Sequence, residues 1–148
     1  MKAKDIMTRN VIFVKEEDKV EDLVKILLDN RISGVPVVDD GHRVVGIVSE
    51  GDLIYPEKSL HLPAFIPVLD GIVFLESFKK LEKEIKKMTA YQVKDVMIKE
   101  VIKVKEDMEV EEVVNVLINK NINRVPVVNE EDKLVGIITR SNILRHIY

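Results

Sequence analysis

The amino-acid sequence predicts a mixed α/β fold made of two pseudo-symmetric repeats, each with the element order β-α-β-β-α. Residues 3–54 align with residues 93–144 without a gap, and 20 of the 52 aligned pairs are identical. Within each copy, short β-branched runs alternate with a stretch of helical periodicity. Because a gapless alignment over this length means a shared backbone course, we expect one architecture used twice.

The first part of each copy predicts a strand followed by an amphipathic helix. Residues 4–7 form a lead-in of one helical turn, and Val11–Val14 is a β-branched and aromatic run that is typical of a strand. Apolar residues then recur at helical spacing, so each copy has a helix with one apolar face. Asp18, with Glu21 three residues later, indicates a capping box at the start of the first helix. The two apolar faces consist of Val20, Leu23, Val24, Leu27 and Leu28 in the first copy and Val110, Val113, Val114, Leu117 and Ile118 in the second.

The second part of each copy predicts a hairpin and a final helix. Val35–Val38 is the second strand. Because proline cannot donate a ladder hydrogen bond, we expect Pro36 at the start of this strand or at an open edge. Residues 39–42 (Asp-Asp-Gly-His) are typical of a hairpin turn, and Val44–Val48 is the third strand. A helix over about residues 49–55 completes the copy.

The chain divides into a first repeat at residues 1–55, a linker at 56–92 and a second repeat at 93–148. Each copy is near the lower size limit for burying its own core, so we expect the two repeats to fold as one unit. The linker has no counterpart in either copy. There we expect an extended apolar run at residues 60–67 and a helix beginning at Ser77, with a solvated face of lysines and glutamates.

Composition and charge argue against several function classes. The net charge of −3 and the isoelectric point near 5.7 argue against a nucleic-acid partner, although the linker lysines leave that alternative open. The chain has no cysteine, no apolar signal segment and no apolar stretch long enough to cross a bilayer, so we expect a cytoplasmic protein without a membrane partner. Scattered histidines, no phosphate-binding glycine loop and no nucleophile elbow lead us to expect no metal site, no required cofactor and no enzymatic activity.

Four motifs occur in the same order in both copies, 90 residues apart: Asp-Ile/Val-Met, Val-Ile-x-Val, Val-Pro-Val-Val and Val-Gly-Ile-Val/Ile-Ser/Thr-x-x-Asp/Asn. Together they make the chain similar to the cystathionine-β-synthase (CBS) domain, present as a tandem pair, or Bateman module, over about 105 of the 148 residues. The resemblance implies a disc-like two-fold pair that dimerises through its helices. It also implies clefts between the repeats that bind AMP, ADP, ATP or S-adenosylmethionine.

No catalytic domain is attached to the pair, so the chain looks like a stand-alone regulatory module. The resemblance leads us to expect a homodimer that senses energy or metabolite state through a protein partner or a change in dimer shape. One alternative is a dimerisation or interaction module whose clefts stay empty, because fold alone does not establish a ligand. A second alternative is a binder of S-adenosylmethionine rather than of nucleotides.

Ser49 and Asp52 are the candidate ligand contacts in the first copy. A carboxylate can accept hydrogen bonds from both hydroxyls of a ribose, and a helix N-terminus beside it suits a phosphate. The resemblance assigns these two positions to the ribose and the phosphate. The same Ser-x-x-Asp pattern is also a capping-box variant that needs no ligand.

The second copy departs from this pattern at one position. Thr139 keeps the hydroxyl, but Asn142 replaces the aspartate, and an amide has only one acceptor oxygen for two donor hydroxyls. Arg140 either adds positive charge near a phosphate or is an exposed surface arginine. We therefore expect the second site to be the weaker one.

Arg124 is the clearest asymmetry between the copies, because the first copy has Gly34 at the matching position. The resemblance implies that a basic residue here reaches the phosphate bound by the other repeat, which is the site of Ser49 and Asp52. Its guanidinium can make bidentate bonds to phosphate oxygens. The alternative is a structural arginine that pairs with Asp39 or Asp40.

The resemblance also assigns apolar residues to an adenine slot in each site, although the same residues are typical of a core. With these, the first site comprises Asn10, Val11, Ile12, Ile32, Val35, Pro36, Ser49, Asp52 and Arg124. The second site comprises Val101, Ile102, Ile122, Val125, Pro126, Thr139, Arg140 and Asn142.

Overall fold

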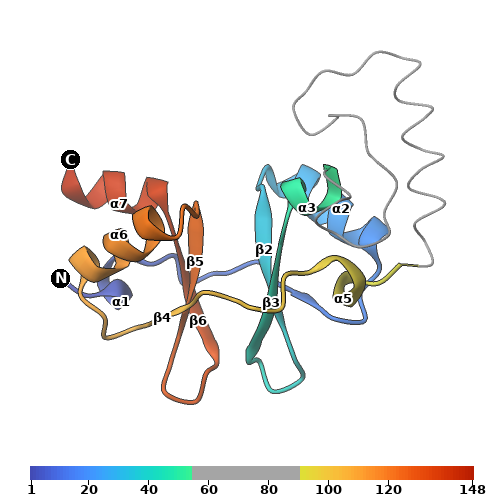
Figure 1. Ribbon diagram of the computed structural model, residues 1–148, viewed down its shortest axis with the longest axis horizontal. Coiled ribbons are helices and arrows are strands. Elements are labelled where there is room, and N and C mark those ends of the chain that lie inside the picture. Colours follow the sequence, from blue (N-terminus) through green and yellow to red (C-terminus); the bar gives the residue numbers. More distant parts are fainter. Residues whose placement is uncertain (55–90) are drawn as a thin grey trace, which may run out of the picture. The chain divides into compact units, whose positions relative to one another are not determined.

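The structure is a computed structural model that describes residues 1–54 and 91–148 (Figure 1). The extended run and the helix that we expect in the linker lie outside the described residues. The two described segments contain both copies of the repeat.

The elements follow the predicted order, and each element of the second copy begins 90 residues after its counterpart. A mixed α/β fold with a doubled β-α-β-β-α order, each copy preceded by a one-turn helix, is therefore confirmed. The first copy contains α1 (Ala3–Ile6), β1 (Val14–Lys15), α2 (Val20–Asn30), β2 (Gly34–Val38), β3 (Val44–Ser49) and α3 (Glu50–Ile54). The second copy contains α5 (Val93–Val96), β4 (Val104–Lys105), α6 (Val110–Asn119), β5 (Arg124–Val128), β6 (Leu134–Thr139) and α7 (Arg140–Ile147).

Each copy forms its own three-stranded sheet, with the orders β1-β2-β3 and β4-β5-β6. In the second sheet β5 pairs parallel with β4 and antiparallel with β6. The short strand β4 pairs only with Val127 and Val128, so Pro126 in the central strand lies outside that parallel ladder. A proline is tolerated there because its missing N–H is not needed by a β4 partner.

Three local predictions were wrong. Pro36 lies neither at a strand start nor at an open edge, because it is the third residue of β2, the middle strand of its sheet. The first strand covers only Val14–Lys15, because Ile12 and Phe13 are 38% and 39% exposed and precede the paired residues. Asp18 does not cap α2. Its carboxylate accepts a hydrogen bond from the backbone N–H of Lys15 at 2.8 Å, and so closes the turn before the helix.

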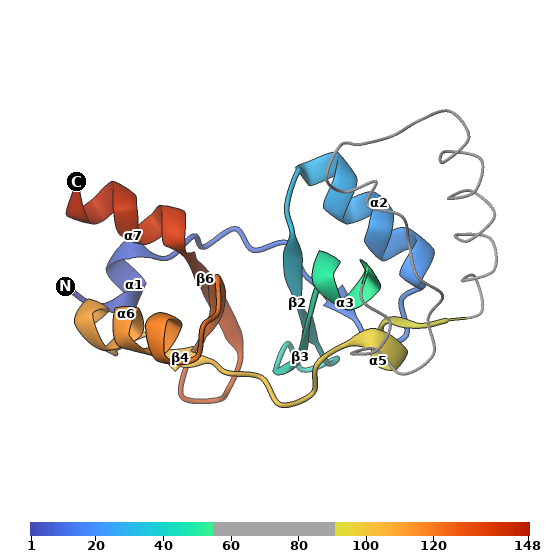
Figure 2. The same ribbon diagram turned by 45° about the horizontal axis from the view of Figure 1, so that its top comes forward.

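The chain forms two compact units, and each unit contains segments of both copies. Unit 1 consists of residues 1–12, 38–45 and 100–148, and unit 2 consists of residues 13–37 and the described parts of 46–99. In unit 1, helices α1, α6 and α7 lie on the same side of the sheet β4-β5-β6 (Figures 1 and 2). The boundaries of the units therefore differ from the boundaries of the sequence repeats.

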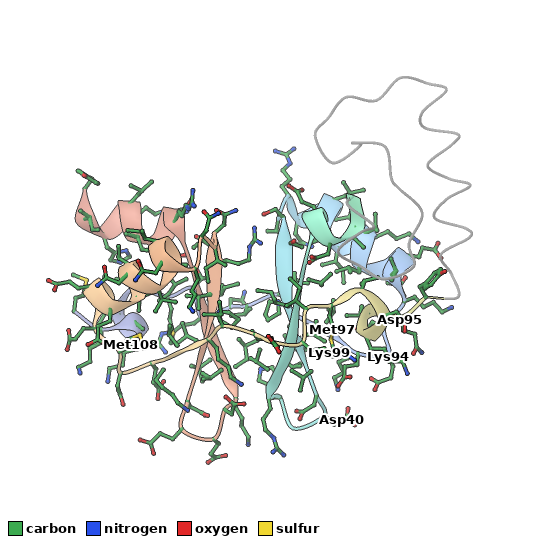
Figure 3. All side chains as sticks on the ribbon, viewed as in Figure 1. Asp40, Lys94, Asp95, Met97, Lys99 and Met108 are labelled. Atoms are coloured by element: carbon green, nitrogen blue, oxygen red, sulfur yellow. The ribbon has the colours of Figure 1, made fainter. Side chains whose placement is uncertain are left out.

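The lead-in of the first copy packs onto the second copy. In unit 1 the backbone N–H of Ala3 donates to Met108 O at 2.8 Å, and that of Lys4 donates to Glu106 O at 3.0 Å. Figure 3 shows Met108 beside α1. The core of unit 1 combines residues of this lead-in with residues of the second copy: Ala3, Ile6, Met7, Val104, Val113, Leu117, Val125, Val127 and Ile138.

The lead-in of the second copy packs onto the first copy in the same way. In unit 2 the backbone N–H of Val93 donates to Asp18 O at 2.8 Å, and that of Lys94 donates to Glu16 O at 3.0 Å. Val93 and Val96 are buried, and Met97 lies beside β3 (Figure 3). Each copy therefore closes its core with the lead-in of the other copy.

Candidate functional site

The first candidate site residues are held at the junction of β3 and α3 in unit 2. The backbone N–H of Ser49 donates to Asp52 Oδ2 at 2.8 Å, and the Ser49 hydroxyl donates to the same oxygen at 3.1 Å. Asp52 is a buried carboxylate, 4% exposed, and the buried hydrophobic residues of the same unit are aliphatic. These bonds fix the orientation of the carboxylate at the first turn of α3.

The corresponding residues of the second copy lie at the junction of β6 and α7 in unit 1. The backbone N–H and the hydroxyl of Thr139 donate to Asn142 Oδ1 at 3.0 Å and 2.8 Å. Asn142 Nδ2 also donates to Ile6 O at 2.9 Å and to Thr8 Oγ1 at 3.0 Å. The two copies thus share the bonds at the helix start, and the second copy adds two bonds to the N-terminal segment.

The second junction has both hydrogen bonds of a capping box, and the first has the bond from the backbone N–H of the cap residue Ser49 to the Asp52 carboxylate. A helix start leaves backbone N–H groups without intrahelical partners, and a polar side chain three residues after the cap residue satisfies one of them. These bonds are made within the chain, so the geometry at Ser49 and Asp52 agrees with the structural interpretation of the motif as well as with the binding one.

Arg124 begins β5, where its backbone pairs with Thr139 of β6. Of the two carboxylates considered as its partners, Asp39 binds its own turn. Asp39 Oδ1 accepts from the backbone N–H groups of Gly41 at 2.9 Å and Arg43 at 2.8 Å, and Arg43 Nε lies 3.7 Å from Oδ2. The backbone hydrogen bond from Arg43 is the largest of the contacts that lower the pKa of Asp39 below its usual value. The carboxylate of Asp39 thus serves the hairpin.

The structure brings the whole predicted second site into unit 1. Val125 and Pro126 are buried in β5, Ile102 and Ile122 pack against the main core, and Val101 packs against a smaller core at the hairpin tips. These side chains therefore act as core residues, as their apolar character indicated.

The residues of the predicted first site are divided between the units. Asn10, Val11, Ile12 and Arg124 belong to unit 1, and the remaining ones to unit 2. Val11 packs against the smaller core of unit 1, whereas Asn10 and Ile12 are exposed. In unit 2 Val35 and Pro36 are buried, and Ile32 is half-buried.

Arg140 is exposed at the start of α7, where it lines a groove between α6 and α7 of about 260 Å³. The face around this groove is apolar, since Ile118 is 68%, Leu144 57% and Ile147 58% exposed. A face of this kind is typical of a protein–protein contact. The remaining lining residues of the groove are Val114, Leu117, Ile118, Ile143 and Leu144.

Sequence reasoning missed Thr8 as a residue of the second junction. Thr8 pairs with Ile137 through two backbone hydrogen bonds of 2.9 Å and 3.0 Å, which places its hydroxyl against the Asn142 amide. In unit 2 the same backbone pair joins Ile98 to Ile47. A signal was present in the sequence, because two matched positions change together between the units. One unit has Thr8 with Asn142, and the other has Ile98 in place of Thr8 and Asp52 in place of Asn142.

Within residues 1–54 and 91–148, no cluster of three or more histidine or acidic side chains is arranged to hold a metal ion. No helix in this described part of the chain is long and apolar enough to cross a membrane.

Comparison with known proteins gives consistent matches. The CBS domain model matches residues 3–56 and 93–148. Uncharacterized protein MJ1426 of Methanocaldococcus jannaschii is 31% identical over 97% of this chain and 89% of its own length. The chloroplastic CBS domain-containing protein CBSX2 of Arabidopsis thaliana is 31% identical over 95% of this chain and 61% of its own length.

Solved structures show the same fold. The crystal structure of CBSX2 in complex with AMP matches with a TM-score of 0.74 at 30% identity, covering 99% of this chain and 95% of that chain. The CBS domain pair of protein MJ0100, in complex with 5′-methylthioadenosine and S-adenosyl-L-methionine, matches with a TM-score of 0.69 at 24% identity, covering 99% and 95%. At that identity the second likeness shows the fold alone.

Proposed function

We propose that this chain, which belongs to the CBS domain family and contains a tandem pair of these domains, is a regulatory module that binds an adenosine-type ligand. The proposed ligand is AMP, ADP or ATP, and the bound state is passed on through a protein partner or a change in dimer shape. Its location in the cytoplasm stays a prediction, as does the absence of enzymatic activity.

The observation that carries this proposal is the buried carboxylate of Asp52 at the start of α3. Its carboxylate is oriented by two hydrogen bonds that Ser49 donates to Oδ2, and carboxylate oxygens act as hydrogen-bond acceptors. A ribose presents two adjacent hydroxyl donors, which a carboxylate matches better than an amide does. The solved complex of the related CBSX2 with AMP supports the same class of ligand.

We propose that Arg124 binds the phosphate of the same ligand. A guanidinium is always charged and makes two parallel hydrogen bonds to phosphate oxygens, each about twice as strong as a neutral hydrogen bond. Glycine stands at the matching position 34 in the first copy and has no side chain to offer. The site that contains Asp52 should therefore bind phosphorylated adenosines more tightly than its counterpart.

A thermal-unfolding panel tests the function. Purified protein is heated with AMP, ADP, ATP, adenosine, S-adenosylmethionine or no addition. A ligand at about 100 times its Kd should stabilise the protein by about 2.7 kcal/mol. Asp52→Ala should abolish the shift for every adenosine compound, because they share the ribose. Asp29→Ala, which removes an exposed aspartate from α2, is the matched control and should keep the wild-type shift. No shift with any compound would refute the proposal.

The second candidate function is a dimerisation module without a ligand. It is favoured by the hydrogen bonds that cap the helix at both junctions and by the exposed apolar face of α6 and α7. The two helices carry opposite charges, because the first turn of α6 contains Glu111 and Glu112 and the last turn of α7 contains Arg145. We propose that a second copy covers this face in a two-fold homodimer, a state that is compatible with either function.

S-adenosylmethionine is the alternative ligand, and the panel separates it from the nucleotides. It carries an adenosine but no phosphate, so Arg124→Ala should leave its binding nearly unchanged. A protein that responds to S-adenosylmethionine far more strongly than to AMP would therefore keep the role of Asp52 and lose the proposed phosphate role of Arg124.

A further inference from the structure

We infer that Asn142 is a positioning residue that holds the N-terminal segment, residues 1–8, onto α7. We infer further that the module consequently binds one adenosine-type ligand per chain instead of two. The first part follows from hydrogen bonds within unit 1. The second part rests on the proposed function as well, and the experiments below keep the two apart.

The side chain of Asn142 has no hydrogen-bonding capacity left for a ribose. Its oxygen accepts from the backbone N–H and the hydroxyl of Thr139, which occupy its two lone pairs. Its NH₂ group has two hydrogens, one for Ile6 O and one for Thr8 Oγ1. Because Asn142 is only 7% exposed, water cannot easily reach its side chain, and the loss of any of these partners would leave a buried polar group unsatisfied at a cost in free energy.

The orientation of this amide is set by two groups that cannot change roles. The backbone N–H of Thr139 is always a donor, and the backbone carbonyl of Ile6 is always an acceptor. Rotating the amide by half a turn would place its NH₂ against the N–H of Thr139 and its oxygen against the carbonyl of Ile6. Only the orientation with Oδ1 toward Thr139 satisfies both groups.

The equivalent position in unit 2 has different chemistry. Ile98 pairs with Ile47 as Thr8 pairs with Ile137, so Ile98 occupies the place of Thr8. It offers no hydroxyl, and Asp52 has no NH₂ group like that of Asn142. In unit 1, asparagine at position 142 is matched by a threonine at position 8. In unit 2, aspartate at position 52 is matched by an isoleucine at position 98. This difference supports a structural role for position 142.

The bonds of Asn142 join segments that are 136 residues apart in the chain. The N-terminal segment is also held by backbone bonds, among them Lys4 N–H to Glu106 O and Thr8 N–H to Ile137 O. Exposed ion pairs of Met1, Lys2 and Lys4 with the second copy and the buried side chains of Ala3, Ile6 and Met7 add to this hold. Asn142 adds two side-chain bonds at the end of α1. One goes to the last residue of the helix, Ile6, and the other to Thr8, two residues later. A ribose at this position would break those bonds and release part of the segment, so binding there is opposed.

Amide hydrogen exchange without ligand tests the positioning role. Asn142→Asp keeps the shape but removes both donors and places a carboxylate against Ile6 O. We expect the amides of Lys4 and Thr8 to exchange about tenfold faster or more, the factor for the loss of two ordinary hydrogen bonds. Asn115→Asp makes the same chemical change at an exposed site on α6 and should leave both rates within about twofold of wild type.

A milder variant keeps this test decisive if Asn142→Asp does not fold. Thr8→Val removes one hydroxyl from an exposed side chain, deletes a single bond to Asn142 and should accelerate the same amides by a smaller factor. Exchange of the Lys4 and Thr8 amides at wild-type rates in Thr8→Val, and in Asn142→Asp if it folds, would overturn the positioning role.

Calorimetric titration with AMP tests the stoichiometry. We expect one AMP per chain in the wild type and none in Asp52→Ala. Two AMP molecules per chain with similar affinity would overturn the inference of one site. No binding of AMP or of any other compound in the panel would refute the proposed function and, with it, the stoichiometry. The exchange rates in the Asn142 and Thr8 variants would still decide the positioning role.

Discussion

Gly136→Ala should destabilise the protein by overpacking the core of unit 1. Gly136 lies in β6, and a methyl group at this position would point at Met7 of the N-terminal lead-in. The added carbon would lie 2.7 Å from Met7 Cγ and 3.0 Å from Met7 Cβ, and in contact with Sδ. Rotating the side chain can move Sδ and Cγ away, but Cβ is fixed by the backbone.

The magnitude follows from the burial of Met7, which is 8% exposed and belongs to the main core. Inserting a methyl group into a packed core costs about 1–3 kcal/mol, because neighbours are forced from their rotamers or the backbone shifts. For a chain of this length, each kcal/mol corresponds to about 2–4 °C in Tm, so we expect a fall of roughly 2–12 °C.

Thermal and urea unfolding measure this effect, and two further variants identify its cause. Gly51→Ala in α3 is the matched control, because among residues 1–54 and 91–148 its added carbon meets only Ser49 Oγ at 3.6 Å. It should stabilise the helix by about 0.5–1 kcal/mol. Met7→Ala combined with Gly136→Ala should cost less than the sum of the two single changes, by about 0.5–3 kcal/mol. Strict additivity, or a Gly136→Ala variant as stable as wild type, would refute the packing argument.

Three further predictions concern the ligand, the first hairpin and the helix face. Arg124→Ala should weaken AMP binding about tenfold to a hundredfold and leave adenosine nearly unchanged, as measured by calorimetry; equal losses would contradict the phosphate role. Asp39→Asn should keep its turn at neutral pH, because Asn129 makes the same two backbone bonds in the second copy. The pKa of Asp39 is lowered chiefly by the backbone bond from Arg43, so its contribution to stability is complete above about pH 3.9 and lost as the pH falls through the lower folded value. In urea unfolding between pH 2 and 7, wild type should lose more stability on the acid side than the variant does, and an equal loss in both would count against this role of Asp39. Ile118→Glu should convert the proposed homodimer to a monomer in light scattering at micromolar concentration, whereas an unchanged mass would move the interface elsewhere.

The elements themselves were predictable from the sequence because their signals are local. The apolar spacing of 20–30 and 110–119 identifies two helices, and the doubled Val-Pro-Val-Val motif identifies the central strands. The 90-residue offset holds at the start of every element. Short-range signals failed where a competing contact was stronger. Asp18 bonds to the backbone N–H of Lys15 instead of the helix start, and pairing of the first strand begins only at Val14.

The sequence was sufficient to identify the candidate binding residues, but not to predict which groups their side chains contact. The Ser-x-x-Asp and Thr-x-x-Asn motifs were visible, and so was the weaker acceptor chemistry of the amide. The sequence did not show that the NH₂ group of Asn142 bonds to Ile6 and Thr8, because that contact joins residues more than 130 positions apart. Donors and acceptors can be counted from residue types, but their partners are set by tertiary packing.

By itself the sequence determined a doubled β-α-β-β-α architecture and the positions at which the copies differ. Only the tertiary structure decided which core each lead-in completes. The two lead-ins, Ala3–Met7 and Val93–Met97, differ at only two of five positions, and both differences are between aliphatic residues. Local periodicity and composition therefore cannot assign either one to a core. The assignment depends on the backbone bonds that each lead-in makes with the other copy and on the apolar area buried there, which exist only once distant segments are packed together.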